Sequence, residues 1–122
     1  MRAAAAFVAL VVAGMAAAQG VRLQHVKAHG ALYNMACRDR ALADAIARAV
    51  ASLDRSFILF GLPNSELIHA GEAAGLRTAA EVFADRAYEP DGAITPRSRS
   101  GSVIHDTTAV VARAIRMVRD QQ

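Results

Sequence analysis

Four chemically different side chains lie within nine residues of one another, in the stretch 26–34. Lys27, His29, Tyr33 and Asn34 supply a cation, an imidazole, a phenol and an amide. An apolar run precedes them and a helical pattern follows. α/β folds present side chains to a ligand in this order of strand, polar loop and helix. The alternative is an ordinary loop in which the histidine only caps a helix or packs.

A second group of polar side chains lies in and just before the segment 84–102, which has no regular pattern. Segments of this length in a compact domain indicate function or mobility. The segment could be a lid or phosphate clamp, because arginine binds oxyanions through two hydrogen bonds. The alternative is a solvated insertion held by turns. Glu81 and Asp85 are acid/base candidates. The candidates for binding a ligand are Arg86, Arg97 and Ser98.

Three short apolar runs are predicted to be strands, and helical patterns separate them. The strands cover residues 21–27, 56–60 and 76–83. Strands joined by helices in this order lie parallel with right-handed crossovers, which predicts an α/β fold. His29 then follows the first strand, and Gly61 follows the second. Glu81 and Asp85 end the third strand, so all four residues are predicted to converge at one edge of the sheet.

Apolar residues at three- and four-residue steps predict three amphipathic helices, each preceded by a capping residue. The caps are Asp39, either Asn64 or Ser65, and Asp106. The residues of the last helix predicted to face inward are Val110, Val111, Ala114, Ile115 and Val118. His69, on the second helix, is expected to be an ordinary surface histidine. His25, within the first strand, is expected to be an interior or packing residue.

The first 18 residues fit two competing patterns. A single Arg2, an apolar run and three alanines before Gln19 resemble a secretory signal with a small-residue cleavage site. The same residues fit an alanine-rich helix over 1–19 that ends at Gly20, a normal position for a C-cap glycine. Cleavage after Ala18 would leave a mature chain that starts on the first strand. We favour a retained helix packed against the sheet and keep export as the alternative.

The composition, 54% hydrophobic and 20% charged residues, is typical of a globular protein. The net charge is +3, but basic and acidic residues are interleaved and aromatic residues are only 5%. The basic stripe with stacking aromatics that marks a nucleic-acid interface is therefore missing. The single cysteine excludes an internal disulfide and a CxxC metal site. We expect no nucleic-acid partner, no membrane partner and no protein-only metal site.

The stretch Val26-Lys27-Ala28-His29-Gly30-Ala31-Leu32-Tyr33-Asn34 resembles the KPHGALYN signature of the LamB/YcsF family, whose members are known as the A subunit of 5-oxoprolinase. The likeness continues, in order, through residues 58–61, 65–67, 72–76, 81–88, 96–98 and 103–106. Ala28 stands where the family usually has proline, so the loop loses a fixed φ angle. The chain is also much shorter than family members. We expect residues 1–122 to form a single, truncated LamB/YcsF-like domain from the middle of the family domain.

The resemblance implies part of an irregular parallel β/α barrel, similar to the glycoside hydrolase/deacetylase fold. It also implies ATP-dependent cleavage of 5-oxo-L-proline to L-glutamate in the cytoplasm, together with 5-oxoprolinase subunits B and C. Mg²⁺ is expected with ATP, held mostly by phosphates and one or two carboxylates. On this reading phosphate is bound by Lys27, Arg86 and Arg97. The acid/base would be His29, Glu81 or Asp85, and Asn34 would orient the substrate.

Two other functions stay open. One is an inactive remnant or scaffold that keeps only subunit binding. The other is a metal-dependent polysaccharide deacetylase-like hydrolase, which rests on fold analogy alone. His25 and His29 are available as its ligands, but no carboxylate spacing completes the set. Because three parallel strands cannot close a barrel, we expect this stretch alone to be inactive and to form homodimers or aggregates through its exposed sheet edges.

Overall fold

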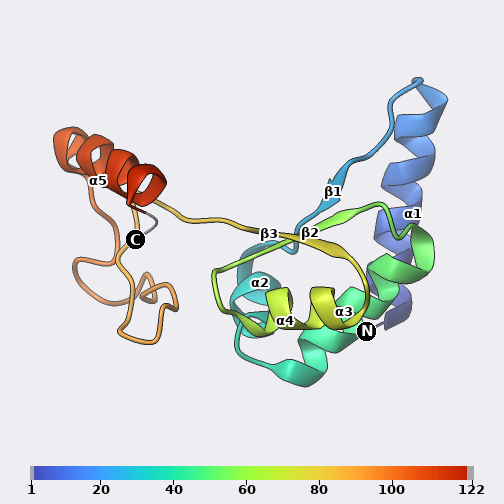
Figure 1. Ribbon diagram of the computed structural model, residues 1–122, viewed down its shortest axis with the longest axis horizontal. Helices are drawn as coiled ribbons and strands as arrows, with labels where there is room; N and C mark the ends of the chain where they lie inside the picture. The colour runs from blue at the N-terminus through green and yellow to red at the C-terminus, as the bar shows by residue number, and fades with distance from the viewer. Residues whose placement is uncertain (1, 121–122) are drawn as a thin grey trace. The chain divides into compact units, whose positions relative to one another are not determined.

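The computed structural model describes residues 2–120, with side chains from Leu10 onward (Figure 1). Met1, which was included in the predicted first helix, lies outside the described residues. The chain divides into two compact units, Met1–Ala80 and Glu81–Gln122. The expectation of one single domain stays a prediction.

A three-stranded parallel sheet lies at the centre of the first unit, in the order β1-β2-β3. Its strands are β1 (His25–Val26), β2 (Ile58–Gly61) and β3 (Arg77–Ala80). The register pairs His25 with Ile58, and Gly61 with Ala80. The parallel α/β arrangement predicted from the sequence is confirmed.

Each strand is shorter than the apolar pattern predicted. The hydrogen-bonded pairing ends where a turn begins or where the neighbouring strand ends. Residues 21–24 precede the first paired residue of β1. Ser56, predicted to start the second strand, lies in a turn in which its N–H donates to the Asp54 carboxylate at 2.7 Å. β3 ends at Ala80 because β2, its only partner in the described sheet, ends at Gly61. Glu81 therefore follows the third strand instead of lying within it.

Helices α2 (Gly30–Ala36), α3 (Arg40–Leu53) and α4 (Glu66–Ala73) lie on the same side of the sheet (Figure 1). α4 packs on β2 and β3, α3 packs beside α4, and α2 contacts α3. The predicted cap of α3 is confirmed, since the Asp39 carboxylate accepts from the Leu42 N–H at 3.0 Å. The first of the predicted amphipathic helices therefore starts where the sequence indicated.

The core of the first unit lies between α4 and the sheet. Leu59 of β2 and Leu67 of α4 are fully buried, and burial of one such side chain contributes about 1.5–3 kcal/mol. Gly71 lets the helix approach the strands: a β-carbon there would lie 2.7 Å from Cγ2 of Thr78. That close approach explains a glycine inside a helix, where it costs about 1 kcal/mol relative to alanine.

The other face of the sheet is less buried. Ile58 and Phe60 alternate with the buried Leu59 and are half-buried. His25 is exposed, with its ring centroid 4.8 Å from that of Phe60. An interior position for His25 in a closed barrel stays a prediction, since three strands are described. The packing contact is confirmed.

The predicted N-terminal helix is confirmed as α1 (Arg2–Ala18). It ends in a Schellman motif, in which the Val21 N–H donates to the Ala16 carbonyl at 2.9 Å and the Gly20 N–H donates to the Ala17 carbonyl at 3.0 Å. Gly20 has φ +70°, which favours glycine. α1 contacts α3 more than the sheet, and its retention in the mature protein stays a prediction. None of the described helices is long and apolar enough to cross a membrane.

The second unit contains a long loop and α5 (Thr107–Arg119). Two isolated antiparallel bridges organise the loop, Arg86 with Val103 and Tyr88 with Ile94. Asp106 caps α5 as predicted: its carboxylate accepts from the N–H groups of Thr108 and Ala109 at 2.8 and 3.2 Å. The loop is therefore ordered by pairing, although it holds no regular strand.

The prediction that α5 buries its apolar stripe is wrong. None of its residues is buried, and Val111, Ile115 and Val118 are 53%, 52% and 83% exposed. Val110 and Ala114 are half-buried. The amphipathic pattern is present, but within this unit the helix has only the loop beside it, and the loop covers part of one side.

Candidate functional site

His29 occupies the N-cap position of α2, with an extended backbone (φ −123°, ψ 154°). Its imidazole makes no capping hydrogen bond and is exposed. Gly30, with φ +58°, makes the turn from strand to helix. The imidazole therefore neither caps α2 nor packs in the core, and its role toward a ligand stays a prediction.

The signature stretch is shorter as a loop than predicted, because α2 already begins at Gly30. Tyr33 and Asn34 therefore lie on a helix. Tyr33 is 4% exposed, and the Nζ atom of Lys27 lies 5.6 Å from the centroid of its ring. A cation over an aromatic face is stabilised by about 0.5–1 kcal/mol. The phenol ring thus orients the ammonium group, whereas Asn34 is exposed.

Gly61 ends β2, and its surroundings give a packing reason for glycine. A β-carbon there would lie 3.0 Å from Cβ of Leu67 and 3.1 Å from Oγ of Ser65. Ser65 is the N-cap of α4, accepting from the Ile68 N–H at 3.4 Å, which decides between the two predicted caps. A ligand-binding role for Gly61 rests only on its place at the strand end and stays a prediction.

Asn64 was not singled out as a site residue from the sequence. It is exposed in the loop after β2, at the same edge as His29, and has φ +56°, the one positive φ among described non-glycine residues. Such a conformation costs on the order of 1 kcal/mol and occurs often at ligand sites. The Pro-Asn-Ser order signals a turn, but it does not reveal the left-handed backbone.

In the second unit, Asp85 lies at the third position of a turn closed by a hydrogen bond from the Arg86 N–H to the Phe83 carbonyl at 3.2 Å. Its side chain is exposed, whereas Glu81 is half-buried. Burial raises the pKa of Tyr88, and the hydrogen bond that its hydroxyl accepts from the Phe83 N–H at 2.7 Å offsets part of that rise, as do Arg113 and Arg86. Tyr88 is therefore a neutral phenol beside the turn.

The arginines of the loop differ in what they bind. Arg86 donates from Nε to the Ser102 carbonyl at 3.1 Å and from Nη2 to the Thr95 carbonyl at 2.8 Å. It therefore ties distant parts of the loop together. Arg97 and Ser98 are exposed, and no side-chain hydrogen bond or ion pair to a described residue is found for either. In this unit they are the predicted ligand-binding residues best placed to meet a ligand.

The first unit brings Lys27, His29 and Gly61 to the carboxyl edge of β1 and β2. Glu81 is the first residue after β3. Asn34 also belongs to the first unit, whereas Glu81, Asp85, Arg86, Arg97 and Ser98 belong to the second. A common cleft for His29 and Asp85 therefore stays a prediction. In the part of the chain that is described, no three His, Cys, Asp or Glu side chains cluster as a metal-ligand set.

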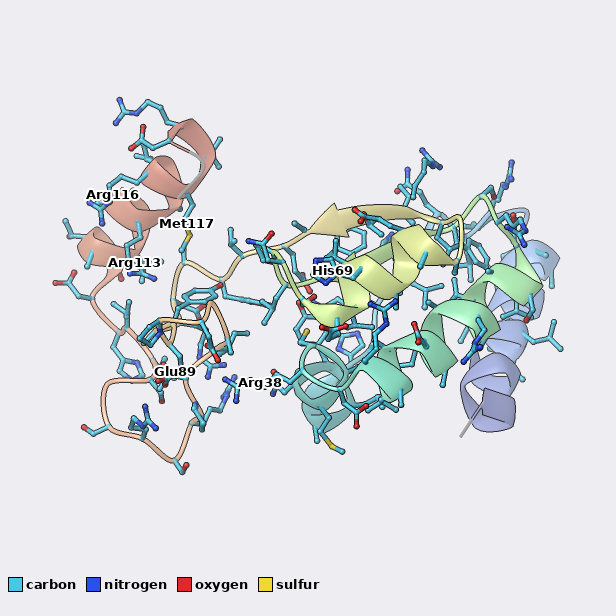
Figure 2. All side chains as sticks on the ribbon, turned by 60° about the horizontal axis from the view of Figure 1, so that its bottom comes forward. Arg38, His69, Glu89, Arg113, Arg116 and Met117 are labelled. Carbon is cyan, nitrogen blue, oxygen red and sulfur yellow. The ribbon has the colours of Figure 1, made fainter. Side chains whose placement is uncertain are left out.

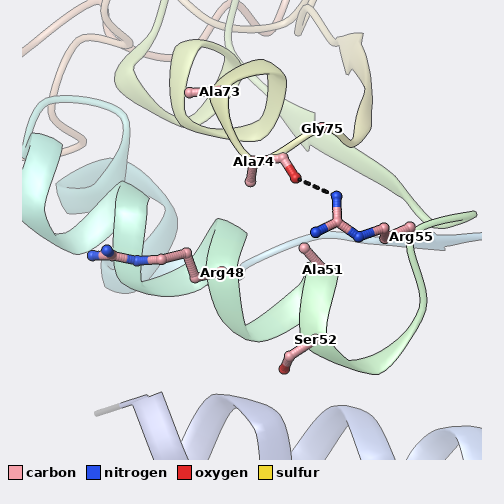
Figure 3. A pocket seen from close by; sticks show the side chains of 7 residues that line it. All are labelled: Arg48, Ala51, Ser52, Arg55, Ala73, Ala74 and Gly75. Atoms are coloured by element: carbon pink, nitrogen blue, oxygen red, sulfur yellow. Dashed lines mark hydrogen bonds between the residues drawn. The ribbon is translucent and has the colours of Figure 1, made fainter.

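A surface cavity of about 560 Å³ lies between α3 and α4, with Arg48 and Arg55 beside small residues of both helices (Figure 3). It lies at the amino end of β3, away from His29. Arg55 donates to the Ala74 carbonyl at 3.3 Å (Figure 3), which satisfies the last turn of α4. The basic lining is therefore explained by helix capping.

A parallel sheet with a helical layer on one side defines an α/β protein, and polar side chains follow its strands at the carboxyl edge. The chain belongs to the LamB/YcsF family, whose profile matches residues 7–122.

The chain is also similar to several named proteins. The A subunit of 5-oxoprolinase from Bordetella pertussis is 56% identical over 108 residues, which are 88% of this chain and 43% of that protein. Its counterpart from Bacillus subtilis is 54% identical over 107 residues, covering 88% and 42%. The crystal structure of a lactam utilization protein from Thermus thermophilus superposes with a TM-score of 0.78 at 45% identity, covering 85% and 42%. The chain thus spans less than half the length of these relatives.

Proposed function

We propose that this chain is part of the A subunit of an ATP-dependent 5-oxoprolinase, which cleaves 5-oxo-L-proline to L-glutamate together with subunits B and C. The names of the relatives support a role in a multi-subunit enzyme. The observation that carries the proposal is the exposed His29, which has no capping hydrogen bond and stands within the family signature. We place the reaction in the cytoplasm.

The chemistry fits the side chains. A lactam is a stabilised amide. Transfer of the γ-phosphoryl group of ATP to its exocyclic carbonyl oxygen would release ADP and open the carbonyl carbon to attack by water. The ring C–N bond would then break with protonation of the nitrogen, and a second water would release phosphate and L-glutamate. Lys27 and Arg97 would neutralise phosphate charge. His29 would move a proton, with Asp85 or Glu81 as the second acid/base, and Asn34 would orient the substrate. Arg86 would contribute mainly by shaping the loop, since two of its nitrogens already bind carbonyls.

The residues also fit Mg²⁺ brought with ATP. Whichever of the exposed Asp85 and the half-buried Glu81 does not serve as the second acid/base would supply a protein ligand for this ion, which commonly takes one or two carboxylates beside phosphate oxygens. When bound, the ion would offset phosphate charge.

We propose further that the three strands belong to a parallel β/α barrel of the glycoside hydrolase/deacetylase type. The parallel order β1-β2-β3 and the similarity to a solved relative of more than twice this length support this view.

The proposal is tested by a graft. Residues 7–122 of this chain replace the matching stretch of the Bordetella pertussis protein, and ATP-dependent glutamate release is measured with that enzyme's own partner subunits. We expect turnover within about tenfold of the parent enzyme, a difference of about 1.4 kcal/mol in activation free energy. A grafted protein that folds and assembles but releases no glutamate would favour the inactive scaffold.

A further inference from the structure

The backbone on both sides of Asp85 is held by one side chain from another element. Arg113 of α5 donates from Nε to the Ala84 carbonyl at 3.1 Å and from Nη2 to the Arg86 carbonyl at 2.9 Å. Arg113 is half-buried, and Figure 2 shows it on α5 near the loop. A single guanidinium group thus brackets the residue that carries a candidate catalytic carboxylate.

Further hydrogen bonds fix the same turn. The Ile104 N–H donates to the Asp85 carbonyl at 2.8 Å, and the Phe83 N–H donates to the Tyr88 hydroxyl at 2.7 Å. With the bond that closes the turn, these contacts leave its backbone little freedom. The Asp85 carboxylate nevertheless stays exposed and makes no hydrogen bond or ion pair with a described residue.

Rigid support beneath an exposed acid has a catalytic use. Reacting groups must be held close to their final geometry, and a displacement of about 1 Å can cost on the order of 100-fold in rate. Arginine suits this task because its planar group presents donors in a fixed fork, whereas the single ammonium group of lysine does not reproduce that fork. The two contacts hold the backbone immediately before and after Asp85.

We propose that Arg113 is a positioning residue for the reaction and that it acts through Asp85. The guanidinium group fixes the backbone of the turn 83–86 and so restricts the positions that the Asp85 carboxylate can take. The inference rests on the proposed function, in which Asp85 serves the chemistry.

The test uses the grafted protein, assembled with its partner subunits, and three substitutions. Arg113→Lys keeps the charge and removes the fork. Arg116→Lys is the matched control, because Arg116 is exposed on the same helix (Figure 2) and donates no side-chain hydrogen bond to a described residue. Asp85→Asn tests the carboxylate itself.

We expect Arg113→Lys to lower kcat by about 10- to 100-fold, with the KM for 5-oxoproline within about twofold of the parent and faster hydrogen exchange at the Ile104 amide. Arg116→Lys should match the parent in all three. An unchanged kcat in Arg113→Lys overturns the inference, and so does a fall in activity that is explained by the amount of folded protein.

A second variant serves if Arg113→Lys does not fold. Tyr88→Phe removes the acceptor for the Phe83 N–H and is expected to lower kcat with KM unchanged. An unchanged kcat in Tyr88→Phe would then overturn the inference.

Asp85→Asn separates this inference from the proposed function. If Asp85→Asn is inactive while Arg113→Lys is normal, only the positioning role is wrong. If Asp85→Asn keeps the parent's turnover, Asp85 has no part in the chemistry, and the positioning role is overturned with it.

Discussion

Replacing His29 by asparagine in the grafted protein is expected to lower kcat by about 10²- to 10⁴-fold, the usual contribution of a general acid or base. The imidazole makes no capping hydrogen bond and is exposed, so its loss should leave folding unchanged. The fall in rate would then report chemistry, and the melting temperature of the variant should be no lower than that of the parent, because asparagine is a favoured N-cap residue.

His69 provides the matched control for this measurement. It is exposed on α4 (Figure 2), as the sequence predicted, and His69→Asn should keep the parent's kcat. If His29→Asn is folded and retains turnover within about twofold of the control, the imidazole takes no part in the reaction.

A polypeptide of these 122 residues alone is expected to show no 5-oxoprolinase turnover, even with competent partner subunits. The sheet has three strands and is open, so β1 and β3 each leave one side unpaired. The stripe of Val111, Ile115 and Val118 on α5 is also exposed, and exposed apolar patches promote association. We expect dimers or larger species, formed through these surfaces.

Glutamate release and sedimentation velocity, measured on the same sample, check this expectation. The grafted protein serves as the control because it contains the same residues in a complete chain. A monomeric 122-residue polypeptide that turns over within about tenfold of the graft would show that these residues suffice for the reaction.

Local signals in the sequence predicted the elements well where one residue decides the outcome. Asp39 and Asp106 cap α3 and α5 as expected, because a carboxylate at an N-cap satisfies free backbone N–H groups. Gly20 ends α1, since the Schellman turn requires a positive φ. The parallel sheet followed from the alternation of strands and helices.

Features set by partners distant in sequence could not be predicted in this way. Strand lengths depend on where a neighbour stops, as at Ala80. Arg86 and Arg97 look alike in the sequence, yet only Arg86 finds carbonyl acceptors across the loop. No local pattern links Arg113 to the turn at Asp85, because 27 and 29 residues separate it from the carbonyls that it binds.

Helix α2 was missed for a different reason. The chemical variety of the stretch 26–34 suggested a loop. Its apolar residues do not recur at three- and four-residue steps over a length that would indicate a helix. The helix instead buries Tyr33 and Ala36 against the first unit. Burial of that ring places it beneath Lys27, so the helix that the pattern did not reveal positions a candidate ligand-binding group.

The proposed function requires that His29 and Asp85 act on one substrate. A crystal structure of the grafted protein with 5-oxoproline bound tests it most directly. We predict that the His29 imidazole and the Asp85 carboxylate both lie in the cleft that holds the ligand, each within about 3.2 Å of it or linked to it by one water. Side chains found at opposite ends of the sheet, with 5-oxoproline touching neither, would contradict the account.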